Sequence, residues 1–172
     1  MKKRLHYGLV FISLFVIFSF TTGCFGGLDD AQEIAATYIN ALYAKSDSPT
    51  AEERYQKIVS TISTNADENP SEHRDDIIKI IQEAMIKGLN KPYYIADNLN
   101  DPQSDTRRSV IIRIPKDAIA VDEFNTDKDT YVNMILIKEG DDWKILDFKH
   151  LDDDTPQGNI EWKEVSPTDY LE

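Results

Sequence analysis

The sequence predicts an α+β fold, in which N-terminal helices pack on a curved antiparallel sheet within one domain. Three observations carry this prediction. Apolar residues recur at helical spacing between residues 29 and 88, and β-branched and aromatic runs bounded by turn residues follow between residues 93 and 148. No internal repeat interrupts this order. Helices followed by consecutive strands are typical of a layered α+β domain.

The first two helices are expected between residues 29 and 64. In the first, apolar residues from position 31 to 42 follow the i, i+3, i+4, i+7 spacing, and acidic residues occupy the first turn, where the helix dipole favours them. The second is predicted to begin at Ser48-Pro49, with Pro49 as its first helical residue. Thr50 and Glu53 have the spacing of a capping box at the same place.

The third helix is expected to follow a polar loop. Asn69 is its predicted capping residue, Pro70 occupies the first helical position, and Gly88 marks the end. Its apolar stripe includes Ile77 and Ile81, which are one turn apart. The helical part of the domain therefore ends just before residue 91, where the spacing changes.

Four strands are expected after that point, over residues 93–96, 110–114, 131–138 and 143–148. Pro115 ends the second strand, because proline cannot donate to a sheet ladder. Gly140 lies in a short acidic segment that predicts a tight hairpin turn between the last two strands. Residues 151–172 hold seven acidic residues, two prolines and one lysine. We expect this C-terminal tail to be extended or loosely packed, with Trp162 as its apolar anchor.

The first 23 residues have the pattern of a secretory signal. Lys2, Lys3 and Arg4 form a basic start, and an apolar stretch with two serines follows from Gly8 to Phe20. In a helix this stretch rises about 20 Å, less than the roughly 30 Å thickness of a hydrocarbon core. Without these residues, 16 of the 19 basic residues remain against 31 acidic ones, a net charge of −15. Phosphate would repel such a chain, so no nucleic-acid partner is expected.

Residues 21–24, Thr-Thr-Gly-Cys, resemble the lipobox of bacterial lipoproteins, in which small residues precede a cysteine. The resemblance implies cleavage before Cys24, acylation of its thiol and a lipid anchor, with residues 24–28 as a short tether. The threonine at the start of the motif departs from the usual leucine. An uncleaved membrane anchor from Leu5 to Leu28 is the alternative. Both interpretations place the domain, residues 29–150, on the extracytoplasmic face of the cell membrane.

Two segments resemble the NTF2-like superfamily of the cystatin-like fold. Residues 35–42 read Ala-x-x-Tyr-Ile-x-Ala-Leu, and residues 134–148 form a long strand, an acidic turn with glycine and a Trp-x-Ile strand. The resemblance implies helices packed against a cone-shaped sheet with a pocket between the two layers. It implies no particular activity, because this fold hosts enzymes, transport adaptors and scaffolds alike.

Alternation along the last strand predicts one face with Trp143, Ile145 and Asp147 and another with Leu146, Phe148 and His150. The resemblance implies that the first face lines the pocket, which makes Asp147, Tyr38 and Trp143 candidates for the pocket rim. Asp147 would then be a candidate general base. We favour the interpretation that Asp147 lies at a fraying strand end and pairs with Arg107, Arg108 or Lys149, because the sequence encodes no partner that would orient a base.

No catalytic, metal or cofactor site is predicted. The acidic runs at residues 122–129 and 152–154 both fail the EF-hand pattern. His73 and His150 are expected at the solvated surface, because a metal or acid–base role needs further ligands or a fixed carboxylate. The tyrosines are expected as core residues with their hydroxyls at the rim. They are Tyr38, Tyr43, Tyr55, Tyr93 and Tyr94.

These observations favour a non-catalytic binding or accessory domain, held at the membrane by its lipid, whose partner is an envelope protein or an apolar ligand. Two alternatives stay open: a small isomerase or dehydratase, and a scaffold subunit of an export or conjugation complex. A deep pocket that holds Asp147 beside a tyrosine or His150 would favour the enzyme. Self-association would favour the scaffold.

Overall fold

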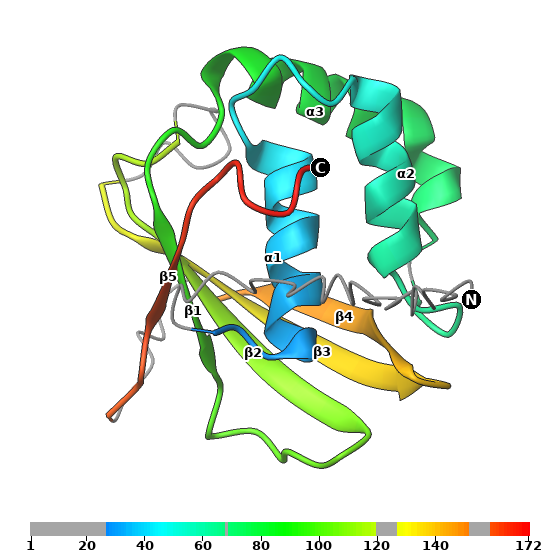
Figure 1. Ribbon diagram of the computed structural model, residues 1–172, viewed down its shortest axis with the longest axis vertical. Coiled ribbons are helices and arrows are strands. Elements are labelled where there is room, and N and C mark those ends of the chain that lie inside the picture. Colours follow the sequence, from blue (N-terminus) through cyan, green and yellow to red (C-terminus); the bar gives the residue numbers. More distant parts are fainter. Residues whose placement is uncertain (1–26, 68, 120–126, 152–158) are drawn as a thin grey trace, which may run out of the picture.

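The computed structural model describes residues 27–67, 69–119, 127–151 and 159–172. Its helical elements are α1 (Asp30–Tyr43), α2 (Ala51–Thr61), the 3₁₀ turn η1 (Pro70–His73) and α3 (Arg74–Lys87), and its strands are β1 (Tyr93–Asp97), β2 (Arg107–Ile114), β3 (Thr130–Glu139), β4 (Asp142–His150) and β5 (Lys163–Val165). The sheet curls around α1, and α2 and α3 cover the side of α1 that faces away from β1 and β5 (Figure 1). The predicted α+β class is confirmed.

Local sequence signals start the first two helices. Asp29 caps α1, and its carboxylate accepts hydrogen bonds from the backbone of Ala31 and Gln32 at 3.1 and 3.0 Å. The capping box predicted from Thr50 and Glu53 is confirmed at the start of α2. Pro49 was expected as the first helical residue and lies outside the helix instead. Thr50 takes the extended cap conformation so that its hydroxyl can accept from the Glu53 backbone, and α2 therefore begins at Ala51, two residues later than expected.

The third helix begins as predicted at Asn69, which caps the 3₁₀ turn η1 before α3 continues from it. It ends at Gly88 because two backbones meet there. A Cβ at this position would lie 2.1 Å from the Tyr43 carbonyl oxygen and 2.4 Å from that of Ala84. The backbone N–H of Leu89 donates to the same Tyr43 carbonyl at 2.7 Å. The ends of α1 and α3 are thereby fixed against one another.

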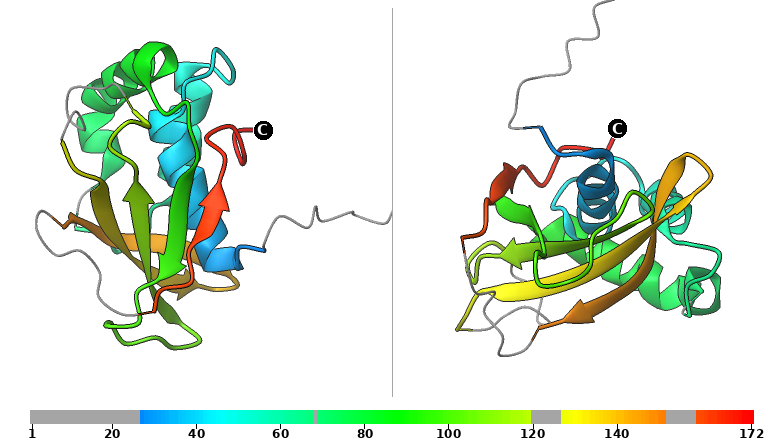
Figure 2. Two further views of the ribbon diagram at one scale, coloured as in Figure 1. Left: turned by 90° about the vertical axis from the view of Figure 1, so that its left-hand side faces the viewer. Right: turned by 90° about the horizontal axis from the view of Figure 1, so that it is seen from below.

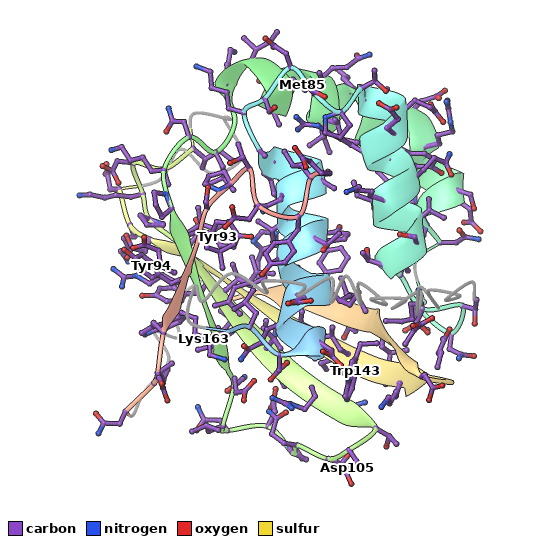
Figure 3. All side chains as sticks on the ribbon, viewed as in Figure 1. Met85, Tyr93, Tyr94, Asp105, Trp143 and Lys163 are labelled. Atoms are coloured by element: carbon purple, nitrogen blue, oxygen red, sulfur yellow. The ribbon has the colours of Figure 1, made fainter. Side chains whose placement is uncertain are left out.

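The sheet has the order β4-β3-β2-β1-β5, and every neighbouring pair is antiparallel. The hairpin predicted between β3 and β4 turns at Gly140, whose φ of 66° lies in the left-handed region that glycine adopts without strain. Inward side chains of β1, β2 and β3 pack on α1 in one core. Tyr93 and Tyr94 point to opposite sides of β1 (Figure 3), and the buried Tyr93 hydroxyl donates to the Ala36 carbonyl on α1 at 3.3 Å.

The C-terminal segment belongs to the folded domain, which corrects the expectation of an extended or loosely packed tail. β5 pairs with β1 at the edge of the sheet, with Val165 opposite Tyr93, and Figure 2 shows the two strands side by side. Val165 and Leu171 are only 2% and 4% exposed. The Asn40 side chain on α1 donates to the Ser166 carbonyl at 3.1 Å, so the chain after β5 closes over α1.

Composition gave no indication of this docking, because the acidic residues that the structure describes after residue 158 are exposed. Glu164 is exposed, whereas its neighbour Val165 is buried. The Trp162 ring lies 6.4 Å from the ring of Tyr131 on β3, so this predicted anchor contacts the sheet face opposite to the helices. Alternation along a short edge strand thus buries the few apolar side chains and leaves the charges in water.

A buried arginine shapes the loop between α1 and α2. The Arg54 side chain is 0% exposed and donates to the backbone carbonyls of Ala44 at 2.7 Å, Ser46 at 2.6 Å and Pro49 at 3.1 Å. No described carboxylate forms an ion pair with it, and burial lowers the pKa of its guanidinium. Arg54 therefore replaces water as the hydrogen-bond donor for a loop that folds over the end of α1.

In the described ranges, no helix has both the length and the apolar composition that a membrane span requires. Cys24 and the whole predicted signal lie outside the described residues, as does most of the two acidic runs. Asp129, at the end of the first run, forms an ion pair with Arg113 at 2.7 Å.

Candidate functional site

A β-bulge on β4 decides which side chains face the helices. Leu136 on β3 pairs with Ile145, and the preceding Ile135 pairs with Asp147, so Leu146 has no partner on β3. Two residues of β4 oppose one of β3 at this point, which is the pattern of a β-bulge. Because side chains alternate with a period of two, the extra residue reverses the face of every side chain that follows it.

The predicted faces of the last strand are therefore wrong beyond Ile145. Phe148 and His150 lie on the helix side with Trp143 and Ile145, paired with the inward residues Met134 and Val132 of β3. Asp147 lies on the opposite, outer side. Strict alternation assigned these faces the other way round, because a bulge leaves no mark in the spacing of apolar residues.

Asp147 is an exposed residue on the outer side of β4, and it lines a hollow of about 220 Å³ together with Ile62 and Phe148. None of the ion pairs among the described residues includes it, so the predicted pairing with Arg107, Arg108 or Lys149 is not observed. Arg108 instead binds Asp29 and Asp97, each at 2.8 Å. Asp147 does not line the cavity between sheet and helices, although its hollow shares Ile62 and Phe148 with that cavity.

That cavity is a cleft of about 260 Å³ between the three helices and the end of β4. Its walls come from α1, α2, η1, α3 and β4, so it is formed by segments that are far apart in the sequence. Most of its lining is apolar or aromatic. The lining side chains are Tyr38, Leu42, Tyr43, Ile58, Ile62, Asn69, Pro70, His73, Asp76, Ile77, Ile80, Phe148 and His150. We call this cavity the helix cleft.

Aromatic rings form the wall between α1 and β4. The Phe148 ring lies 5.9 Å from the Tyr38 ring at an interplanar angle of 41°, within the range of favourable tilted pairs. Tyr38 and Tyr43 are 9% and 7% exposed, whereas Phe148 is 37% exposed. A ring with that exposure at the edge of a cleft can contact a bound molecule without any rearrangement of the core.

Polar side chains gather at the mouth of the helix cleft. His73 on η1, Asp76 on α3 and His150 on β4 are all exposed and all line the same cavity. The expectation that both histidines lie at the surface is thus correct. Sequence analysis missed that they line the same cavity. Part of the signal was available, because residues 73, 76, 77 and 80 have the spacing of one helix face. The position of His150 depends on the bulge and had no such signal.

The three predicted rim residues lie in three places. Tyr38 lines the helix cleft, and Asp147 lies outside it. Trp143 lies beside the first half of α1 (Figure 3) and lines a broad depression of about 410 Å³ together with Asp30 and Glu33. Burial and the two neighbouring aspartates raise the pKa of Glu33. Of the three residues, Tyr38 is the one that lines the helix cleft.

A hydrogen-bond network joins both ends of the described chain. Lys163 on β5 donates to the Gly27 carbonyl and to the Gln32 side chain, each at 2.8 Å. The Gln32 amide in turn donates to Asp97 at 3.0 Å, and Asp97 binds Arg108. The start of the domain, next to the predicted tether, is therefore fixed to the sheet edge.

Metal binding has no structural candidate among the described residues, where no three side chains of histidine, cysteine, aspartate or glutamate are grouped suitably. The acidic runs at residues 122–129 and 152–154 lie mostly outside that part of the chain. The cleft itself offers two imidazoles, one carboxylate and two phenol groups around an apolar interior. Such a set can hold a small molecule by apolar contact and by a few hydrogen bonds.

No protein-family model matches the chain, and no curated protein matches it. Among solved structures, one similar chain carries the name Rd1NTF2_05 followed by five substitutions. The two chains are 14% identical with a TM-score of 0.39, over 70% of this chain and 99% of that chain. A likeness of this extent carries no argument about function, and the fold class described above rests on the order of the elements and on the sheet topology.

Proposed function

We propose that the protein is a lipid-anchored extracytoplasmic lipoprotein whose α+β domain is a non-catalytic binding module, with the helix cleft as its binding site. The observation that carries the proposal is the cleft, where exposed Phe148 and a mostly apolar lining meet polar groups at the mouth. This combination is typical of sites that bury an apolar body and orient it by a few polar contacts. The occupant is an apolar ligand or an apolar side chain of an envelope protein.

The anchor is supported by the signal sequence and by the start of the domain. Gly27 is three residues beyond Cys24, a chain length of at most about 11 Å. Its carbonyl is held by Lys163. A lipid on Cys24 would therefore keep this end of the domain close to the bilayer. Two or three acyl chains are enough for stable anchoring, whereas a single chain is marginal.

The position of Asp147 supports a binding role over catalysis. This residue was the candidate general base, and its pairing with Ile135 puts it on the outer side of the sheet, whereas Phe148 faces the helices. A general base must come within hydrogen-bond reach of its substrate. Asp147 is not among the side chains that line the helix cleft, so it is not placed to act as the base for a molecule bound there.

One observation favours an enzyme as the second candidate. His73, Asp76 and His150 line the same cleft, and imidazole with carboxylate is a common acid–base set. An isomerase or dehydratase that used these residues would release a chemically changed molecule. A binding module would release its ligand unchanged, so mass spectrometry of a recovered ligand separates the two functions.

The anchor is tested by the Cys24→Ser variant in cells grown with labelled fatty acid. Loss of the thiol should abolish incorporation and leave either uncleaved precursor or released protein. The matched control is Ser46→Ala, which leaves Cys24 in place and should be labelled like the natural protein. Label on the Cys24→Ser protein would contradict the lipoprotein assignment.

The cleft is tested by photo-crosslinking in intact cells. A photoreactive phenylalanine analogue replaces Ile77, which lines the cleft, or Ile86 on the same helix, which is 70% exposed and lies outside it. We expect an adduct from position 77 and none from position 86. Adducts of equal yield from both positions would contradict a specific cleft site. An adduct between two copies of the protein would support the scaffold function instead.

A further inference from the structure

One side chain supplies the formal charge of the helix cleft. Of the side chains that line it, Asp76 is the one that is charged when histidine is counted as neutral, and neither lysine nor arginine is among them. The ion pairs of the described chain do not include Asp76, although its neighbour Asp75 pairs with Arg74 at 3.2 Å. The mouth of the cleft thus presents a carboxylate that the described residues leave unpaired.

Two basic side chains that adjoin the cleft in the sequence, Arg74 and Lys149, are directed elsewhere. Arg74 follows η1 directly, but its guanidinium binds Glu52 at 2.5 Å and lies over the Tyr55 ring at 5.5 Å. Lys149 is adjacent to two lining residues of β4, yet the bulge places it on the outer side, opposite Asn133. The same local irregularity that brings Phe148 to the cleft therefore keeps a lysine out of it.

The aromatic side chains that line the helix cleft also favour a cation as the ligand. Tyr38, Tyr43 and Phe148 contribute three aromatic rings, and the faces of such rings attract an ammonium group within about 6 Å. The rest of the lining is largely aliphatic and would cover an apolar body. A volume of about 260 Å³ is small for a ligand site, so the occupant is about the size of one substituted ring.

We propose that the helix cleft binds a small organic cation, an ammonium group carried on an apolar body, with the ammonium held by Asp76 and the aromatic rings and the apolar body on the aliphatic lining. This inference rests on the proposed binding function of the cleft and adds the chemical class of the ligand. The net charge of −15 on the chain after residue 23 acts in the same direction, because a strongly acidic protein raises the local concentration of cations.

Calorimetry on the mature lipoprotein in nanodiscs of a neutral glycolipid, whose headgroup carries no ammonium, tests the proposal, with empty nanodiscs as the blank. The probes are benzyltrimethylammonium, benzyl alcohol and phenylacetate, which share a ring and differ in charge. We expect the cation to bind about tenfold more tightly than the alcohol, and phenylacetate to bind most weakly. Asp76→Asn should weaken binding of the cation about tenfold and leave binding of the alcohol unchanged.

The matched control is Asp75→Asn, which removes the same charge at the neighbouring residue. The Asp75 side chain is 96% exposed and does not line the cleft. We expect it to leave binding of the cation within about twofold, since exposed charges are screened by salt. Equal effects of the two variants would overturn the proposal, because the cation would then respond to net charge alone. Equal affinity for all three probes would overturn the ligand class while leaving the cleft as a binding site. Binding of none of them would also overturn it, and photo-crosslinking at Ile77 decides the binding role separately.

Discussion

The ring of Phe148 lies 5.9 Å from the ring of Tyr38, which places the end of β4 against the middle of α1. This contact exists because Leu146 has no partner on β3, so that the residues after the bulge face the helices. Without the bulge, Asp147 would face the helices and Phe148 would face water. Because Leu146 is unpaired, the wall of the helix cleft has the aromatic ring of Phe148 in place of the carboxylate of Asp147.

The Arg54→Met variant should lower the free energy of unfolding by about 3 kcal/mol, because three backbone carbonyls lose their donor in a buried place. Arg54→Lys should lie between the two proteins, since an ammonium cannot reproduce the fork of a guanidinium. Urea unfolding followed by tryptophan fluorescence measures all three.

Arg74→Met is the matched control for this prediction. Arg74 lies on the surface with 47% of its side chain exposed, and its partner Glu52 is exposed as well. Its loss should cost less than about 1 kcal/mol. If the Arg54 and Arg74 variants were equally stable, the buried arginine would not hold the loop between α1 and α2.

Val165→Ala should lower the free energy of unfolding by about 2 kcal/mol, because the valine side chain is buried between β5 and the core. Glu164→Ala, one residue earlier on the exposed side of the same strand, should change it by less than about 0.5 kcal/mol. The same unfolding experiment compares the pair. A neutral Val165→Ala variant would mean that the C-terminal segment is not part of the cooperative core.

Acidification should weaken the contact between Glu139 and the segment after α2. Hydrogen bonds from Ser63 at 2.5 Å, and secondarily from Thr64 and Asn65, hold the pKa of Glu139 below its ordinary value of 4.5. A depressed pKa contributes stability that is fully present above the ordinary value and is lost as the pH falls through the folded-state value. Glu139→Gln should therefore be less stable than the natural protein at pH 7.

The difference between these two proteins should shrink as the pH falls below 4.5, because Glu139 of the natural protein then becomes protonated. Unfolding curves collected from pH 7 to pH 3 measure the difference directly. A difference that stayed constant over this range would contradict a charge-assisted contact, and one that grew on acidification would reverse its sign.

Much of the helical half of the fold could be predicted because its signals are local. The stripe of α1 and the capping box at Thr50 and Glu53 each depend on residues within one or two turns of each other. The start of α2 was predicted two residues too early, since Pro49 and Thr50 both carry a helix-start signal and the two signals place the first turn differently. Such competition is settled by hydrogen bonds and not by spacing.

The features that were missed are non-local. β5 forms only when Val165 meets Tyr93, which lies far from it in the sequence, and the acidic composition around Val165 pointed to a loose tail. The bulge at Leu146 is a mismatch of length between β3 and β4, so neither strand alone reveals it. The helix cleft combines residues from five elements. That its two histidines line one cavity could not be predicted before these strand pairings were known.

The central claim is that Phe148 lies on the helix side of β4 and Asp147 on the outer side, because the lining of the helix cleft depends on it. The most direct measurement is the nuclear Overhauser spectrum of the mature lipoprotein in deuterated nanodiscs, with Tyr38→Leu and Phe148→Leu variants to assign the rings. We predict cross-peaks between the ring protons of Phe148 and Tyr38. Cross-peaks from Phe148 to the methyl groups of Ile135 on the outer side, with none to Tyr38, would contradict the claim.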